Sequence, residues 1–310
     1  MNNSCAAALG RGTADSYTVA NMTQLTKPIR DARAQAGQAV RETAARARPA
    51  VELLARAGYA AKGVVYTLVG GLALLSAVGS GGRTTGSTGA LRSLLDHSFG
   101  QALLAVIAVG LAGYAAWCLI RALFDPEHDG RDARGLWKRA VHFCKGLAHA
   151  ALVVAVVHMI RGTAAAGGED RRVRDWTAWL MSFPFGIWLV GATGVGVLVF
   201  GVRQLYRAWA VDVDEPLDLR RMGVAAHRWT LAFSRLGMAA RGVVFGIIGA
   251  FLVAASRHAD PAEAQGVGGA LRAVRQQSYG DVLLAVVALG LIAYGAFQFV
   301  LARYRRIKSF

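Results

Sequence analysis

Three cations stand at matching places in the most apolar stretches of this 310-residue chain, and they are the first candidates for binding chemistry. Lys62, Lys145 and Arg241 each precede a glycine, and each lies towards one end of a long apolar segment. A cation at the centre of a bilayer costs at least about 2.5 kcal/mol on insertion scales, so its presence needs a reason. Either the long side chains reach back to the headgroup region, or the cations converge on an anionic lipid headgroup or an anionic solute. The sequence leaves both interpretations open.

A polar stripe runs along the middle one of these segments. His142, Lys145 and His149 share a helix face, because residues three, four and seven apart lie above one another. Tyr59 and Tyr66 occupy the equivalent positions of the first segment. A metal or haem site needs further ligands, and no apolar segment supplies a carboxylate in its middle or a second histidine cluster. We therefore interpret the stripe as an interior polar patch and expect no metal and no cofactor.

Motifs of known catalytic chemistry are missing from the chain. It has no HExxH, no phosphate-binding loop, no GxSxG and no cysteine pair. Cys5, Cys118 and Cys144 form neither a disulfide framework nor a metal-site spacing. The lack of acidic residues inside the apolar segments weighs against ion-coupled transport but leaves facilitated passage open. The chain is therefore not expected to be an enzyme.

The elements that hold these residues are six apolar segments of about 20 residues each, the length of helix that crosses a hydrocarbon core of about 30 Å. They run over residues 59–79, 99–121, 140–161, 185–206, 236–256 and 281–302. Their uninterrupted apolar character excludes the alternating pattern of a membrane β-barrel. The predicted fold is an all-α integral membrane protein with six transmembrane helices.

Charge predicts both the partner and the orientation. The net charge is +16, but the cations lie between apolar segments in stretches too short to form a nucleic-acid-binding domain. We expect contacts with the bilayer and its anionic lipids and none with nucleic acid; the sequence points to no protein partner and no oligomeric state. Lys and Arg number 22 on the side of both termini and 9 on the other side, which predicts cytoplasmic termini for a multi-pass membrane protein. Arg171, Arg172 and Arg174 oppose this orientation locally.

The chain repeats itself. Arg56–Gly71 matches Arg235–Ala250 at 8 of 16 positions, and Gly89–Trp117 matches Gly269–Phe297 at 15 of 29. A diverged middle copy aligns through Lys145-Gly146 and through Phe185-Gly186. The expected organisation is an arm over 1–52, repeat 1 over 53–125, repeat 2 over 136–210, a linker over 211–231 and repeat 3 over 232–308. We expect the arm to be disordered or partly helical near the cytoplasmic face, and a pseudo-threefold arrangement of the repeats is the sharper possibility.

Small residues recur on the first helix of each repeat. Gly63, Gly146 and Gly242 are each followed four residues later by another small residue, Gly246 in repeat 3. This spacing lets another helix approach closely, so we predict helix packing there. Between the two helices of repeats 1 and 3, the stretches 89–98 and 269–278 are compatible with short helices at the outer interface.

These repeats resemble an actinobacterial family of membrane proteins known as domain of unknown function 1206. The matching stretches are ARAGYAAKGVVYTLVGG, ALRSLLDHSFGQALLAVIAVGLAGYAAW, SRLGMAARGVVFGIIGA and ALRAVRQQSYGDVLLAVVALGLIAYGAFQFVLARYRRI. The resemblance covers residues 53–308 and implies six transmembrane helices in three pairs. It brings no activity, substrate or catalytic residue. The sequence and this resemblance therefore favour a non-enzymatic, multi-pass protein of a bacterial plasma (inner) membrane that binds lipid or a membrane partner. The alternative is a transporter or channel for a small solute.

Overall fold

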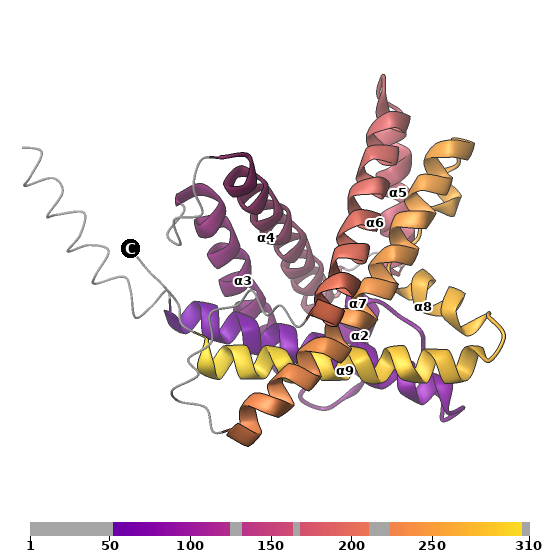
Figure 1. The fold of residues 1–310 in the computed structure, drawn as a ribbon. Helices are drawn as coiled ribbons and strands as arrows, with labels where there is room; N and C mark the ends of the chain where they lie inside the picture. Colours follow the sequence, from indigo (N-terminus) through magenta and orange to yellow (C-terminus); the bar gives the residue numbers. More distant parts are fainter. Residues whose placement is uncertain (1–51, 125–131, 164–167, 211–223, 306–310) are drawn as a thin grey trace, which may run out of the picture. The chain divides into compact units, whose positions relative to one another are not determined.

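The computed structural model describes residues 52–124, 132–163, 168–210 and 224–305 (Figure 1), and the regular elements in these ranges are helical. Residues 1–51 of the predicted arm, which is expected to end at residue 52, and residues 211–223 of the predicted linker lie outside the described residues. Within the described ranges, six helices are long and apolar enough to cross a membrane: a first helix (Glu52–Ala77), α3 (Gly100–Phe124), α4 (Ala133–Ile160), α6 (Gly186–Ala210), α7 (Val224–His258) and α9 (Gly280–Tyr304). Each contains most of one predicted segment, so the predicted fold class is confirmed. The last part of the predicted linker belongs to α7.

Shorter helices connect the two long helices of each repeat. They are α2 (Ser87–Arg92) with the 3-10 turn η1 (Ser93–Asp96), α5 (Glu169–Met181), and η3 (Pro261–Glu263) with α8 (Val267–Arg275). We call their side of the molecule the connector end and the opposite side the terminal end. The predicted short helices of repeats 1 and 3 are confirmed, but α2 and α8 do not only lie on a surface. Leu91 and Leu271 are fully buried in the main hydrophobic core.

The turn into the second helix has the same form in all three repeats. An exposed aromatic residue is followed by a buried glycine; the pairs are Phe99-Gly100, Phe185-Gly186 and Tyr279-Gly280. A Cβ on any of these glycines would collide with a carbonyl oxygen at the end of the preceding connector helix. Phe185 and Tyr279 also adopt positive φ, 66° and 60°, which non-glycine residues rarely do. The glycine is therefore required by the close approach of the chain to itself.

One helix contact is repeated three times around the molecule. The first helix of each repeat lies against the second helix of another, and the paired residues are Gly63 with Gly295, Gly146 with Ala115, and Gly242 with Gly201. Gly295, Ala115 and Gly201 are equivalent in the alignment of the repeats. A Cβ on Gly63 would lie 3.0 Å from the carbonyl oxygen of Gly295, and one on Gly242 would lie 2.9 Å from that of Gly201. The recurrence of one contact in register is the mark of pseudo-threefold symmetry.

An arginine reinforces this contact at the terminal end. Arg56 and its equivalent Arg139 each donate two hydrogen bonds to the last carbonyl oxygens of the neighbouring second helix. The acceptors are Ala302 and Arg303 for Arg56, both at 2.8 Å, and Ala122 and Leu123 for Arg139, at 2.8 and 3.1 Å. These carbonyl groups lack partners within their own helix and carry its negative dipole end, so a guanidinium there is favourable.

The contact within a repeat is present only in repeats 1 and 3. Gly58 lies against Tyr114, and the equivalent Gly237 lies against Tyr294. In repeat 2 the equivalent of Gly58 is Val141, whose branched side chain prevents such an approach. Accordingly, α4 packs on α3 and α6 packs on α7, while the described residues of α4 and α6 do not form a packed pair. A Cβ added to Gly196 would meet nothing within 4 Å, although the equivalent Gly110 and Gly290 are packed.

Exposed tryptophans gather at both ends of the long helices. Trp137, Trp209 and Trp229 lie at the terminal end, and Trp176, Trp179 and Trp188 lie at the connector end, each more than half exposed. Tryptophan is enriched at the two membrane–water interfaces, where its ring has an apolar body and a polar edge. Two such belts fit helices that cross a bilayer.

Candidate functional site: a cluster of cations and tyrosines

Lys62 is held inside the protein by the second helix of its own repeat. Its side chain lies ten residues into the 26-residue first helix and is only 7% exposed. Its Nζ donates a hydrogen bond of 3.0 Å to the Tyr114 hydroxyl on α3 and lies 4.2 Å from the centre of the same ring. The ammonium group therefore combines a hydrogen bond with a cation–π contact.

Arg241 repeats this arrangement in repeat 3. Its Nη1 donates a hydrogen bond of 2.7 Å to the Tyr294 hydroxyl on α9, and its guanidinium carbon lies 4.3 Å from the ring centre. Tyr294 is the equivalent of Tyr114, and Arg241 is the equivalent of Lys62. The same cation–tyrosine pair is thus built twice by equivalent helices.

Tyr66, one turn after Lys62 on the first helix, lies against the second pair. Its ring lies 4.7 Å from that of Tyr294, edge to face, and 5.6 Å from the guanidinium carbon of Arg241. Tyr59, one turn before Lys62, is 3% exposed and stacks on Tyr114 at 5.4 Å. Edge-to-face contacts of this kind add to the stabilisation from burial and fix the ring orientations.

Repeat 2 contributes one ring to this group. His149 on α4 lies 4.7 Å from the Tyr114 ring, and its Nδ1 contacts the Lys145 carbonyl oxygen at 2.7 Å. His149 and Lys62 therefore both lie against the Tyr114 ring. Lys145 is half-buried on α4. His142 is half-buried nearby, and neither of its ring nitrogens has a hydrogen-bond partner among the described residues.

The third cation–tyrosine pair is missing for a reason visible in the sequence. Phe200 replaces Tyr114 and Tyr294 in repeat 2, so no hydroxyl is present. Its ring lies instead 5.2 Å from Phe245 and 5.8 Å from Arg241. We name Lys62, Tyr66, Tyr114, His149, Arg241 and Tyr294 the cation–tyrosine cluster. It belongs mainly to repeats 1 and 3.

The chemistry of the cluster suits an anion. Two permanent cations and three phenol hydroxyls within one group offer positive charge and several hydrogen-bond donors. Among the described residues no group of three His, Cys, Asp or Glu side chains could hold a metal ion. A charge-assisted hydrogen bond to an anion in such a poorly hydrated place is stronger than one in water.

The predicted packing residues lie at helix contacts. A Cβ on Gly146 would lie 2.9 Å from the Leu119 side chain, and Gly63 and Gly242 approach their neighbours as described above. Gly246 would accept a Cβ of its own without a neighbour within 4 Å. A Cβ on Gly201, however, would lie 2.6 Å from the Gly246 backbone nitrogen.

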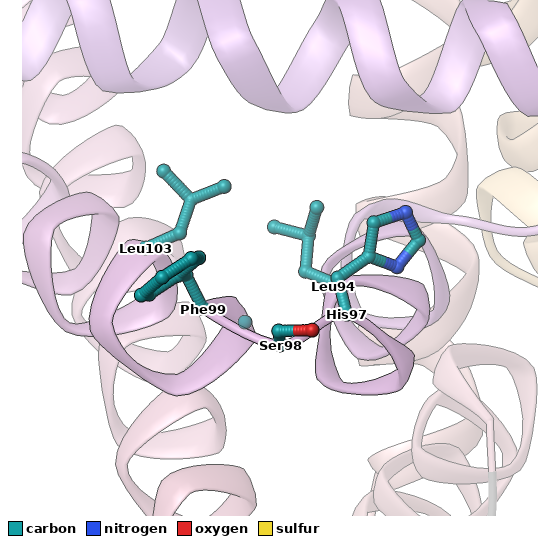
Figure 2. A pocket seen from close by; sticks show the side chains of 6 residues that line it. Leu94, His97, Ser98, Phe99 and Leu103 are labelled. Carbon is teal, nitrogen blue, oxygen red and sulfur yellow. The ribbon is translucent and has the colours of Figure 1, made fainter.

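Two hollows lie away from the cluster, at equivalent turns of the connector end. One of about 380 Å³ is lined by Leu94, His97, Ser98, Phe99, Gly100 and Leu103. Figure 2 shows Leu103 and Phe99 on one side of it and Leu94 and His97 on the other. The second, of about 340 Å³, is lined by Met181, Phe183, Phe185, Gly186, Ile187 and Trp188. Neither lining includes a residue of the cation–tyrosine cluster.

The connector end has its own polar group, which we name the acidic pair: Glu169 and Asp170, the first two residues of α5. Asp170 accepts hydrogen bonds from the backbone nitrogens of Gly266 and Gly269 at 2.8 and 3.2 Å, and from Arg272 at 2.6 Å. Glu169 accepts from the Thr88 backbone nitrogen at 3.4 Å. Neither α2 nor α8 has a side-chain cap of its own, so the acidic pair caps both helices from α5.

Burial controls the charge of Glu169. Loss of water raises the pKa of its carboxyl above the ordinary value, and hydrogen bonds from the Thr88 and Val267 backbone amides offset this only in part. Neighbouring Asp170 acts in the same direction as burial, whereas Arg172 opposes it. The raised pKa means that removing the proton from this carboxyl is costly in the folded protein.

Sequence reasoning missed four residues that matter here. Tyr114 and Tyr294 occupy equivalent positions of repeats 1 and 3, the same two repeats whose first helices carry Lys62 and Arg241 at equivalent positions. This shared pattern could have predicted the cation–tyrosine pairs. Glu169 and Asp170 open a helix in a sequence without a close counterpart in the other repeats, so no repeat signal was available. Their partners come from two other connector segments, which only the folded chain brings together.

Six membrane-crossing helices in three equivalent pairs define a multi-pass α-helical membrane protein. The family model described as "Domain of Unknown Function (DUF1206)" matches residues 57–125, 140–210 and 236–305, and the chain belongs to this family. An uncharacterized protein, YxxB, of Bacillus subtilis (strain 168) is 33% identical over 260 residues, which cover 84% of this chain and 93% of that protein. No solved structure matches the chain. The comparisons point to no enzyme family.

Proposed function

We propose that this protein is a non-enzymatic protein of the plasma (inner) membrane that binds an anionic lipid headgroup through the cation–tyrosine cluster. The observation that carries the proposal is the pair of equivalent contacts, Lys62 with Tyr114 and Arg241 with Tyr294. Cations that only reached back to the headgroups would point towards the helix ends. These two side chains instead lie among aromatic rings within the protein.

A phosphate group fits the donors of the cluster. Lys62 supplies a compact positive charge, while Arg241 supplies a planar group that binds two phosphate oxygens at once. The tyrosine hydroxyls can turn to donate to an oxygen of the ligand. This chemistry is shared by a lipid headgroup and a free phosphate-bearing solute, and the surrounding bilayer makes a lipid the abundant source.

The test is lipid retention by single and double glutamine variants. The protein is purified in mild detergent, and bound phospholipid is measured by mass spectrometry for Lys62→Gln, Arg241→Gln and the double variant. Binding at the cluster predicts severalfold loss of anionic lipid and effects that are not additive, because the two cations share one ligand. Arg228→Gln, an exposed arginine on the same helix as Arg241, is the matched control.

Three outcomes decide between the candidates. Small and additive losses equal to those of the control leave headgroup snorkelling as the role of the cations and overturn the proposal. Stabilisation by inorganic phosphate but not by vesicles with phosphatidylglycerol favours a free solute. Uptake of a phosphate-bearing solute into proteoliposomes, abolished by the double variant, would establish the transporter alternative instead.

The orientation of the chain belongs to the same proposal, since it decides which leaflet the cluster faces. The asymmetry of Lys and Arg supports an orientation with both termini and the terminal end on the cytoplasmic side. Reporter fusions after Phe124, Tyr206 and Arg305 should read cytoplasmic, and fusions near Gly82, Gly168 and Pro261 should read external. An external reading after Tyr206 contradicts this topology.

A further inference from the structure

Helix α5 differs from the other connector helices in what it exposes. On α8, Ala270 and Leu271 are fully buried, and on α2 so are Ala90 and Leu91. On α5, Trp176 is 66% exposed and Trp179 is 54% exposed. An exposed group of large aromatic side chains on a folded protein marks an interaction surface.

The exposed aromatic side chains of α5 and of the turn that follows it form one row. Trp176 and Trp179 meet edge to face with ring centres 5.3 Å apart, and Trp179 meets Phe183 in the same way at 4.9 Å. Spacings of three and four residues put these side chains on one face. We name the row, together with Phe185 and Trp188 at the start of α6, the aromatic stripe.

A second face of α5 is polar and a third is buried. Arg171, Asp175 and Ser182 follow one another at the same helical spacing and are exposed, while Thr177 is 6% exposed and faces the protein. The helix therefore has an inner face, an aromatic face and a polar face side by side. This is the pattern of a helix that lies along a membrane–water interface.

The aromatic stripe is also continuous with a membrane-crossing surface. Phe185 and Trp188 are 83% and 78% exposed at the beginning of α6, which is itself long and apolar enough to cross the bilayer. The 340 Å³ hollow lies within the stripe, and its lining residues other than Gly186 are apolar or aromatic. A lipid surface fits this continuity, because the same bilayer that surrounds α6 would cover α5 at headgroup depth.

We infer that α5 is an anchor that lies in the connector-side membrane interface, with the aromatic stripe inserted at headgroup depth and the arginines beside anionic lipid headgroups. This assigns a role to Arg171, Arg172 and Arg174, whose charge runs against the orientation rule for the chain. An interfacial helix uses arginine and tryptophan together, and its arginines need not report which side is cytoplasmic.

Spin labels on opposite sides of α5 test this inference. Labels are attached to Trp176→Cys and, separately, to Ala178→Cys, in full-length protein whose native cysteines are replaced by alanine. Ala178 is exposed, and two residues along a helix turn its side chain away from the aromatic face and towards the polar one. The proteins are reconstituted into vesicles of phosphatidylethanolamine and phosphatidylglycerol. Collisions with oxygen, which concentrates in the bilayer, and with a water-soluble nickel chelate are then measured. We expect the ratio of oxygen to nickel accessibility to be severalfold higher at position 176 than at position 178.

Two results would overturn the inference. Strong nickel accessibility at both positions would place the stripe in water. Low accessibility of position 176 to both reagents would mean that a protein, such as a second copy of this chain, covers it. As a second measurement that keeps the aromatic face intact, Trp176→Phe/Trp179→Phe should lose much of the tryptophan emission quenched by lipids brominated near the headgroup. An unchanged quenched component contradicts the inference as well.

Discussion

The cation–tyrosine cluster and the connector end use the three repeats in opposite ways. Repeats 1 and 3 build the cluster through equivalent contacts, Lys62 with Tyr114 and Arg241 with Tyr294, and repeat 2 adds mainly the His149 ring. At the connector end repeat 2 holds the other two: the acidic pair on α5 caps α2 and α8. Repeat 2 therefore contributes little to the cation–tyrosine cluster but supplies the side chains that hold the connector end together.

The contacts between repeats explain how repeat 2 stays in place although the described residues of its own two helices do not form a packed pair. All three repeats keep the glycine-mediated contact with their neighbour, represented by Gly63, Gly146 and Gly242. Only the contact within the repeat is lost in repeat 2, where Val141 stands in place of a packing glycine. Because the contact between repeats anchors both helices of repeat 2, its own pair can separate and its connector can acquire a new sequence.

The strongest test of this comparison copies the middle repeat into the other two. Gly58→Val and Gly237→Val introduce the side chain of Val141 where a Cβ would lie 2.7 Å from the Tyr114 nitrogen and the Tyr294 Cα, respectively. Neither backbone can move aside easily, so each variant should lose about 3 kcal/mol or more of unfolding free energy. The measurement is thermal unfolding in detergent.

The matched control for these variants is Gly196→Val, at the open position of repeat 2. A Cβ there meets nothing within 4 Å, so the free energy of unfolding should change by less than about 0.5 kcal/mol. Equal losses in Gly58→Val and Gly196→Val would show that α4 and α6 pack as tightly as the other pairs.

The acidic pair is tested next, with Asp170→Ala. This change removes three hydrogen bonds that join α5 to α8, including the ion pair with Arg272 at 2.6 Å. Loss of a helix cap together with a charged hydrogen bond should lower the unfolding free energy by about 2 kcal/mol. Asp175→Ala, on the exposed polar face of the same helix, should have almost no effect. Similar losses in both variants would show that Asp170 does not stabilise the connector end through its contacts with α8.

A smaller effect tests whether equivalent contacts between repeats contribute equally to stability. Arg56→Gln and Arg139→Gln each remove two hydrogen bonds to the last carbonyl oxygens of the neighbouring helix. Because the contacts are equivalent, each variant should lose a similar amount, about 1 kcal/mol, in thermal unfolding. A loss confined to one variant would mean that the contacts between repeats differ in strength.

The number, length and pairing of the helices could be predicted from sequence because they depend on local composition and on repetition. An apolar run of membrane length must form a helix, and the match of Gly89–Trp117 to Gly269–Phe297 shows equivalence without any structure. The residues at which the helices begin and end were harder to predict from sequence. The predicted linker included residues of α7, since a membrane helix can continue past its apolar part into polar sequence.

The candidate site could be predicted only in part. The cations and the first-helix tyrosines were visible because they align between repeats. The pairing of Lys62 with Tyr114 depends on how closely Gly58 packs against Tyr114. The distance between the two helices cannot be predicted from composition. The interfacial role expected for the connectors of repeats 1 and 3 fits α5 better, because burial of Leu91 and Leu271 follows from tertiary contacts rather than from local pattern.

The smallest predicted effect is a pH dependence that originates at the acidic pair. Burial raises the pKa of the Glu169 carboxyl in the folded protein above its ordinary value of 4.5. Between the unfolded and folded pKa values the folded state holds a proton that the unfolded state has released. The contribution of Glu169 to stability is therefore complete below the unfolded pKa and is lost as pH rises through the folded pKa.

Glu169→Gln isolates this contribution, because glutamine resembles the protonated carboxyl and does not titrate. Melting temperatures of wild type and variant are compared between about pH 4 and about pH 8, the range in which a buried carboxyl titrates. The wild type should lose more stability than the variant as pH rises, because burial favours the protonated carboxyl in the folded protein. Identical pH profiles would show that Glu169 keeps an ordinary, hydrated carboxyl. In that case the cap that Glu169 provides for α2 would be weaker than the cap that Asp170 provides for α8.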